Sequence, residues 1–369
     1  MIYLDFGATS FVKPPEVKRA VSRAMDTCAS PGRGGYPAAM AASRLVYGAR
    51  ETAAKLFDCQ PEQAVFTSSC THGLNIAISS LISPGDRVVI SGFEHNAVVR
   101  PLYALGAEIV VAGRRLFDWE DTISSFRRAL DRGAKAAVFT HVSNVFGYEL
   151  PVQELAAVCR EKGVPFILDA AQSAGKYPIS LNKLGAAFIA APGHKGLLGP
   201  QGTGLLLCGA EGTPLLYGGT GSQSASRRMP PELPERLEAG TLNVPGIAGL
   251  GAGMAYVLQA GPENIGRRER GLILSCADAL CAAGAKVYRG PHQGGTLSFT
   301  GNMDCEELAD ALSRRGFALR AGLHCAPLAH ESAGTAGAGT VRLSVGYGTT
   351  RRQLDAFCRE SSKILLRRK

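Results

Sequence analysis

The sequence predicts an α/β protein, with a large domain built on a mainly parallel sheet and a smaller C-terminal α+β domain. Three observations support this fold class. From about residue 60, short apolar runs alternate with segments of helical periodicity, as in parallel strands joined by helices. After about residue 205 the chain becomes rich in glycine and proline. The last hundred residues then mix helical patterns with separate strand-like runs.

The expected elements follow in chain order. Two helices come first, one opening on Pro14 and Pro15, which suit a first helical turn, and an alanine-rich one at residues 38–56. The apolar runs of the large domain are "AVFTSS", "RVVIS", "AEIVVAG", "AKAAVFTHVS", "PFILDAAQS" and "AAFIAAP", with helical patterns such as "HGLNIAISSLI" and "VQELAAVCREKG" between them. The C-terminal strands are "GGTLSFTG" and "TVRLSVGYG". We expect the large domain to cover residues 15–250 and the small domain to cover residues 1–14 and 251–369.

Composition limits the class of protein. With 369 residues, 46% of them hydrophobic and 19% charged, the chain is long enough for a sizeable core and has an ordinary globular composition. It shows no basic stretch followed by an apolar run at its start, and no apolar segment near the roughly 18 residues that span a bilayer. We therefore expect a soluble, cytoplasmic protein with no membrane partner.

The ten cysteines and the net charge of +9 add two expectations. The cysteines are scattered without a CxxC pair, which predicts neither disulfides nor a structural metal. The positive charge fits a mildly basic surface, or a docking face for an acidic partner or a nucleic acid. Because no nucleic-acid motif is visible, we expect no direct nucleic-acid partner.

Polar residues follow two of the predicted strands. Ligands of open parallel sheets bind at the carboxyl ends of the strands, where Asp169 and Gln172 end "PFILDAAQ". A carboxylate after apolar residues is costly unless it pairs with a cation, although it could also cap a helix. Cys70, Thr71 and His72 lie between a strand and a helix, where backbone N–H groups favour an anion such as phosphate, or need only a simple cap.

Lys195 stands in "PGHKGLLGPQGTG", just beyond a strand and between His194 and a glycine. A loop lysine is normally solvated, but here the glycines would allow something to approach the backbone closely. A lysine, a strand-end aspartate and a phosphate-type helix start together fit pyridoxal phosphate. The lysine would form the Schiff base, the aspartate would keep the pyridine nitrogen protonated, and the helix start would take the phosphate.

Cys325, in "RAGLHCAP", is either an activated thiolate or one more packed cysteine. Arg320 and His324 would supply a positive field for a thiolate. The composition of residues 331–340, "ESAGTAGAGT", predicts a flexible loop that would make the thiol mobile. The other cysteines that we weighed are expected in helix cores, at a strand end or in the phosphate turn, and they are Cys159, Cys276, Cys281, Cys358, Cys208 and Cys70.

Over nearly its whole length the chain resembles the class V, fold-type I enzymes that depend on pyridoxal phosphate. Within them it resembles the cysteine desulfurase and selenocysteine lyase family. The order and spacing of ten motifs carry this resemblance. They are "YLDFGATS", "PGRGGY", "FTSSCTHGLN", "FEHNAVVRP", "HVSNVFG", "LDAAQSAG", "GHKGLLGPQGTG", "EAGTLNVPGI", "RAGLHCAP" and "VRLSVGYGTT".

The resemblance implies roles around the cofactor. Lys195 would bind it covalently, Asp169 would pair with the pyridine nitrogen and Gln172 would face the ring hydroxyl. His95 would stack on the ring and shuttle protons. The residues implied around the phosphate are Cys70, Thr71 and His194, together with Thr241 from the neighbouring subunit. A homodimer with shared active sites is therefore implied.

The resemblance also implies the substrate residues and the reaction. Asn144 and Arg342 would hold the substrate carboxylate, and Cys325 would be the nucleophile. L-cysteine would become L-alanine, leaving a persulfide on Cys325 that passes to a protein sulfur acceptor. Two alternatives stay open. One is another class V activity, namely a selenocysteine lyase acting on L-selenocysteine, a β-lyase or an aminotransferase. The other is a catalytically silent paralogue that serves as a scaffold.

Four positions depart from the family pattern. Phe6 and Gly7 replace the usual asparagine and alanine, His72 replaces a common glutamate, and Pro192 stands where many relatives have a phosphate-binding serine or threonine. These positions bear on substrate range and on cofactor affinity.

Overall fold

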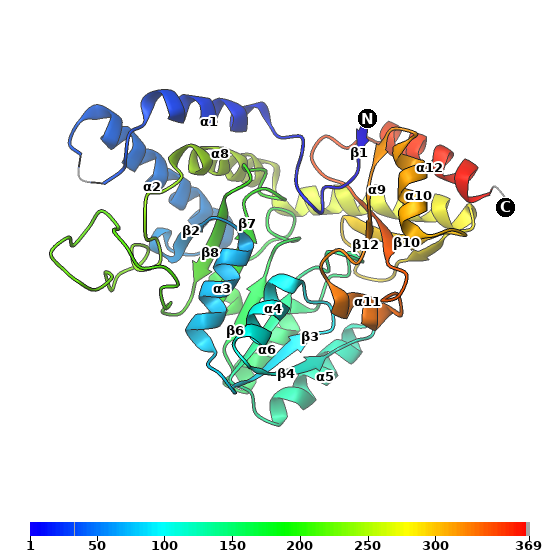
Figure 1. The fold of residues 1–369 in the computed structure, drawn as a ribbon, viewed down its shortest axis with the longest axis horizontal. Helices are drawn as coiled ribbons and strands as arrows, with labels where there is room; N and C mark the ends of the chain where they lie inside the picture. The colour runs from blue at the N-terminus through cyan, green and yellow to red at the C-terminus, as the bar shows by residue number, and fades with distance from the viewer. Residues whose placement is uncertain (33, 367–369) are drawn as a thin grey trace.

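A seven-stranded sheet forms the centre of the large part of the molecule (Figure 1). In the computed structural model, which describes residues 1–32 and 34–366, its strand order is β2-β8-β7-β6-β5-β3-β4. The strands are β2 (Ala64–Thr67), β3 (Arg87–Ser91), β4 (Glu108–Ala112), β5 (Ala136–Thr140), β6 (Phe166–Asp169), β7 (Phe188–Pro192) and β8 (Gly204–Cys208). Every pairing from β4 to β7 is parallel, whereas β8 is antiparallel to both of its neighbours. The mainly parallel sheet is confirmed.

Helices cover both faces of this sheet. Successive strand residues point to opposite sides, so apolar strands place side chains on both faces that the helices bury. On one face, Val89, Phe139 and Leu168 belong to a core shared with α2, α5, α6 and α8. On the other, Val88, Val138 and Ile167 pack with α3 and α4. The helices of this part are α1 (Pro15–Thr27), α2 (Pro37–Phe57), α3 (Cys70–Leu81), α4 (Asn96–Ala104), α5 (Trp119–Asp131), α6 (Val152–Glu161), α7 (Leu181–Leu184) and α8 (Val244–Ala260), with a short 3-10 turn η1 (Pro61–Gln63).

The C-terminal part has its own antiparallel sheet, ordered β12-β13-β10-β9, with its own core. Its strands and helices are β9 (Lys286–Tyr288), β10 (Thr296–Thr300), β12 (Arg320–Gly322), β13 (Thr340–Ser344), α9 (Pro262–Ala282), α10 (Cys305–Ser313), α11 (Pro327–Ala333) and α12 (Arg351–Leu365). The N-terminal strand β1 (Ile2–Tyr3) returns here and pairs in parallel with β11 (Phe317–Ala318) (Figure 1). The exact division at residues 14 and 250 remains a prediction.

Two local expectations were wrong. Residues 331–340 are not simply a loop, because residues 331–333 complete α11 and Thr340 begins β13. Between them Thr335 is buried, and its hydroxyl lies 2.7 Å from Nδ1 of His330. The helix-core assignment also fails for Cys281, which is exposed, and in part for Cys358, which is half-buried. In the portion of the chain that the structure describes, no helix has both the length and the apolar character needed to cross a membrane.

Candidate active site

The predicted site residues converge at the carboxyl edge of the large sheet. Asp169 is the last residue of β6, Lys195 follows β7, and Cys70 opens α3 after β2. His95 follows β3, and Asn144 follows β5. Because the carboxyl ends of parallel strands meet at one edge of a sheet, residues far apart in the sequence form one site there.

Asp169 is a buried carboxylate in need of a cation. It is 2% exposed, and its Oδ1 accepts a 2.8 Å bond from the Ala171 N–H. The Cys70 thiol lies 3.6 Å from the same oxygen. Burial raises the pKa of Asp169, while the nearby Lys195 opposes that shift. No residue in the described part of the chain forms a salt bridge with it, so a protonated ring nitrogen would supply the missing positive charge.

The buried amine of Lys195 loses its proton more readily than an ordinary lysine does. Burial, and then the positive charge of Arg342, lower its pKa to about 8, although Asp169 and Cys70 act in the opposite direction. Within the described residues, its ammonium group forms neither a hydrogen bond nor a salt bridge. The glycine after Lys195 allows close packing of two backbone segments, because a Cβ at Gly196 would collide with the Ala174 carbonyl. This packing holds the lysine loop tightly against the chain.

The start of α3 combines a cap with free donors. The Ser69 hydroxyl caps the helix by accepting a 3.1 Å bond from the His72 N–H. The N–H groups of Cys70 and Thr71 in this first turn have no partner among the described residues, so they remain available to an anion. Nearby, Nδ1 of His194 lies 3.0 Å from the Thr9 hydroxyl. Burial and Lys195 lower the pKa of His194 to about 4, so it is neutral.

His95 caps α4 through its side chain. Its Nδ1 accepts a 2.9 Å bond from the Ala97 N–H, which assigns the ring proton to Nε2. Burial lowers the pKa of His95 to about 4, helped by Lys195, Arg342 and Arg100, so the ring is neutral.

Sequence reasoning missed the adjacent Glu94, which is fully buried and whose pKa burial raises to about 8. It accepts bonds from the Ser91 hydroxyl and from the Thr140 N–H.

Arg342 anchors the end of the site predicted for the substrate. It is 2% exposed, and its Nη2 lies 2.6 Å from Oδ1 of Asp5. Its Nη1 donates a 3.1 Å bond to the Asn144 carbonyl, while its buried Nε has no partner in the described part of the chain. Sequence reasoning missed Asp5, although it is the acidic residue of "YLDFGATS". This carboxylate stabilises the buried guanidinium and fixes its orientation.

The departures at residues 6 and 7 lie beside this arginine. A Cβ at Gly7 would stand 3.2 Å from Cζ of Arg342, so the missing side chain leaves room there. The Gly7 carbonyl accepts a 2.9 Å bond from Nε2 of Gln172, the residue predicted to face the ring hydroxyl. Phe6 is buried and packs edge-on against Tyr3. The N-terminal segment is thus a wall of the site.

Cys325 projects from a tight turn that is anchored on both sides. Its side chain is exposed, and both His324 and Cys325 have positive φ values, of 51° and 56°. The Cys325 carbonyl accepts a 2.7 Å bond from the Asn96 N–H. Ala326 is fully buried in an apolar cluster that also contains Phe93 and lies between the two parts of the molecule. Such a strained backbone needs surrounding contacts to hold it, and here they hold the thiol outward.

The prediction that His324 supplies positive charge to this thiol was wrong. Burial, followed by the charge of Arg342, lowers the pKa of His324 to about 3, so this histidine is neutral. Its Nε2 lies 3.1 Å from the Thr340 carbonyl. Arg320 is engaged with Asp5, at 3.4 Å between Nε and Oδ2. His324 contributes instead through its backbone, because its carbonyl accepts a 2.8 Å bond from Nδ2 of Asn144.

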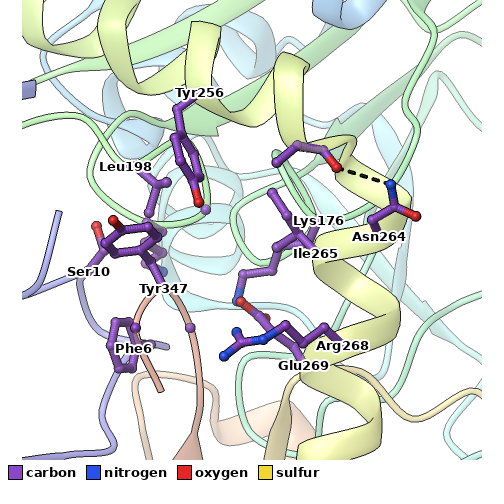
Figure 2. A pocket seen from close by; sticks show the side chains of 15 residues that line it. Phe6, Ser10, Lys176, Leu198, Tyr256, Asn264, Ile265, Arg268, Glu269 and Tyr347 are labelled. Atoms are coloured by element: carbon purple, nitrogen blue, oxygen red, sulfur yellow. Dashed lines mark hydrogen bonds and ion pairs between the residues drawn. The ribbon is translucent and has the colours of Figure 1, made fainter. Parts of the chain in front are cut away.

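A cavity of about 360 Å³ lies beside Lys195 (Figure 2). Figure 2 shows Phe6, Ser10 and Tyr347 on one side of it and the paired side chains of Lys176 and Glu269 on the other. Lys176 and Glu269 are both buried, at 2.8 Å between Nζ and Oε2. Among the described residues, neither Asp169 nor Arg342 lines this space. The cavity and the cluster of predicted site residues therefore share Lys195.

Thr241 is the one predicted residue that the fold leaves apart. It is exposed on the long segment between β8 and α8, and it lines a surface cavity with Gly219 and Leu242. The prediction that it serves a neighbouring subunit remains untested. Within residues 1–32 and 34–366, no group of three or more potential metal-ligating side chains comes together.

Comparison with known proteins agrees with this geometry. The model of the family "Aminotransferase class-V" matches residues 2–357. A probable cysteine desulfurase of Methanothermobacter thermautotrophicus is 32% identical, over 96% of this chain and 92% of that protein. The apo structure of a cysteine desulfurase from Thermococcus onnurineus superposes with a TM-score of 0.91 at 28% identity, covering 99% of this chain and 94% of the other.

The cysteine desulfurase CsdA of Escherichia coli gives a TM-score of 0.86 at 25% identity, covering 98% of this chain and 95% of the other. These matches span both parts of the molecule and the long segment that contains Thr241. The chain has the fold-type I architecture, and it belongs to the class V aminotransferase family, within the cysteine desulfurases.

Proposed function

We propose that this protein is a cysteine desulfurase that removes sulfur from L-cysteine, releases L-alanine and carries the sulfur as a persulfide on Cys325. The observation that carries the proposal is a short chain of contacts from the thiol to the substrate end of the site. Arg342 bonds the Asn144 carbonyl, and the Asn144 side chain bonds the His324 carbonyl, directly before the cysteine. An exposed thiol is thereby tied to the residues that would hold the substrate.

The residues present fit pyridoxal phosphate, which the family implies. The buried Asp169 carboxylate, which lacks a cation, matches the ring nitrogen. The Lys195 amine, with its lowered pKa, matches the aldehyde. The free N–H groups at the start of α3 match the phosphate. Bound there, the cofactor would serve as an electron sink for the negative charge left on the substrate α-carbon. Asp169 would hold the ring nitrogen in its protonated form, and the neutral His95 would be available to pack on the ring.

The protein residues supply the proton chemistry and the orientation. Arg342 would bind the substrate carboxylate with the donor capacity that Asp5 and Asn144 leave free, notably at its buried Nε. With a pKa near 8, the Nζ of Lys195 exchanges protons at neutral pH, so it can accept the α-proton and later return a proton to the product carbon. Neutral His95, which carries its proton on Nε2, can donate a hydrogen bond without adding charge.

Sulfur transfer requires the Cys325 thiolate. Its sulfur attacks the substrate sulfur, a sulfur–sulfur bond forms, and the carbon–sulfur bond breaks with its electron pair left on the alanine fragment. The anchored turn limits how far the thiol can move, while its exposure lets the resulting persulfide meet an acceptor. We propose a protein acceptor, because an exposed turn can be reached by a partner surface.

A homodimer with shared sites is part of the proposal. Thr241 lies away from the other cofactor residues of its own chain, on a segment that also exposes Leu215, Leu216 and Tyr217. Exposed apolar side chains support a subunit contact on this segment. The cytoplasmic location expected from composition is likewise retained as a proposal.

The test compares two exposed cysteines. Cys325→Ala should release alanine from L-cysteine about 10³-fold more slowly than wild type, because the attacking thiolate is gone. Cys281→Ala, which removes an exposed thiol on α9, should keep the wild-type rate. Alanine is quantified with and without a thiol reductant, and with L-selenocysteine as a second substrate. A wild-type rate on L-cysteine in Cys325→Ala would refute the proposal and favour a thiolate-independent lyase.

A further inference from the structure

Two cysteine sulfur atoms lie close together in the C-terminal part, on elements that the proposed reaction does not use. Cys276 on α9 and Cys358 on α12 place their Sγ atoms 3.3 Å apart. The two residues are 82 positions apart in the sequence, so the contact results from packing of the first and last helices of this part. Two sulfur atoms this close need only a short approach to reach the bond length of a disulfide, about 2.05 Å.

The two thiols differ in access. Cys276 is 1% exposed and sits in the core of this part, among residues such as Leu280 and Phe357. Cys358 is half-buried, so a small reagent can reach it from the surface. The pair therefore has one outer sulfur and one inner sulfur.

They also differ in acidity. The hydrogen bond between the thiols lowers the pKa of Cys358 and raises the pKa of Cys276. Burial and the negative charge of Asp355 raise the pKa of Cys358, whereas the positive charges of Arg351 and Arg359 lower it further. The outer sulfur, of Cys358, therefore ionises more readily and would attack a disulfide first. The inner thiol, of Cys276, lies close enough to attack Cys358 in the next step.

We propose that Cys276 and Cys358 are a redox modification site, which a low-molecular-weight disulfide such as glutathione disulfide converts into an intramolecular disulfide. The Cys358 thiolate attacks one sulfur of the small disulfide, forms a mixed disulfide and releases one small thiolate. Cys276 then gives its proton to the released small thiolate and attacks Sγ of Cys358, releasing the second thiolate. Two protein thiols are oxidised, and one small disulfide is reduced to two thiols.

The bond would tie α12 to α9 across the core of the C-terminal part. To form it, the sulfurs must move from 3.3 Å to about 2.05 Å apart, which side-chain rotation and a small helix shift can provide. Closing a chain segment of this length restricts the unfolded chain more than the folded one. The oxidised form should therefore resist heating better than the reduced form. The site is independent of the proposed desulfurase activity.

The experiment uses the full-length protein, reduced and then exposed to glutathione disulfide. Peptide mapping without reduction should recover the Cys276 peptide joined to the Cys358 peptide, with the loss of two hydrogen atoms. The exposed Cys281 and Cys325 should instead carry glutathione, because neither has a partner thiol beside it in the described structure. The thermal midpoint should rise by a few degrees on oxidation and return with dithiothreitol.

Single variants test the order of attack. In Cys276→Ser, Cys358 should retain glutathione as a stable mixed disulfide. In Cys358→Ser, Cys276 should stay a free thiol, because it is buried. The matched control Cys281→Ser should still form the cross-link. Wild-type protein in which Cys281 and Cys325 react while Cys276 and Cys358 never become joined would overturn the proposal, and that result requires no variant to fold.

Discussion

Two cysteines of the candidate site lie in opposite environments. Cys70 is buried against the Asp169 carboxylate at the end of the large sheet, and burial followed by that negative charge raises its pKa well above the usual value. Cys325 lies exposed on a turn of the C-terminal part. The first region is built on buried strand ends, and the second on a turn at the junction of the two parts.

The difference separates two chemical tasks. Burial raises the pKa of Asp169 and lowers that of Lys195, so the carboxylate needs a cationic partner to stay ionised and the amine gives up its proton more readily. Around Cys325, exposure allows a sulfur atom to leave the site on a protein. Substitutions in the buried region should therefore impair every reaction of the enzyme, whereas substitutions near the turn should impair sulfur transfer or substrate affinity alone.

The largest effect is expected from Lys195→Ala. Without the amine, covalent cofactor binding and proton transfer are both lost, so turnover should fall by about 10⁴-fold or more. The visible absorbance of the purified protein should disappear as well. Lys183→Ala, at an exposed lysine of α7, is the control and should keep both. Borohydride reduction of wild type should label the Lys195 peptide, and a label on another lysine would contradict the assignment.

Asp169→Asn should come next, with a loss of about 10²- to 10³-fold in turnover. The amide keeps the shape but cannot stabilise a protonated ring nitrogen. Exchange of the substrate α-proton with solvent, followed by NMR, should slow by a similar factor while cofactor still binds. Near-normal α-proton exchange in this variant would show that Asp169 has a purely structural role.

The lowered pKa of Lys195 predicts a pH profile for cofactor capture by cofactor-free protein. The pKa of Lys195 is about 8, so the amine is mostly protonated when the pH is below that value. The capture rate should therefore rise about tenfold per pH unit up to about pH 8 and then level off. A solvated lysine, with a pKa near 10.4, would keep accelerating to about pH 10. Stopped-flow absorbance distinguishes the two pH profiles. A plateau reached only near pH 10 would mean that burial does not lower the pKa of this amine.

A smaller effect is expected from Asp5→Asn. Arg342 would lose its charged partner but keep its bond to the Asn144 carbonyl, so KM for L-cysteine should change by about tenfold or less. The kcat should stay near wild type, because Asp5 does not touch the reacting atoms. A fall in kcat with unchanged KM would place Asp5 in the chemical step instead of in the orientation of Arg342.

Local sequence patterns predicted the parallel sheet and the strand-end residues well, because apolar runs and their flanking polar residues are local signals. Asp169 and Lys195 were found in this way. Contacts between distant segments leave no such signal, and so Asp5 beside Arg342 was missed. The state of His324 was predicted wrongly because its charge depends on burial by the surrounding fold. The pairing of Cys276 with Cys358 was likewise visible only after folding.

The most direct test of the account is the location of the transferred sulfur. Wild-type protein is given L-cysteine without reductant, alkylated and digested, and all ten cysteines are examined by mass spectrometry. The account predicts one extra sulfur atom on the peptide that contains Cys325, with alanine released in equal amount. Extra sulfur on another cysteine, or alanine release with no protein-bound sulfur, would contradict it.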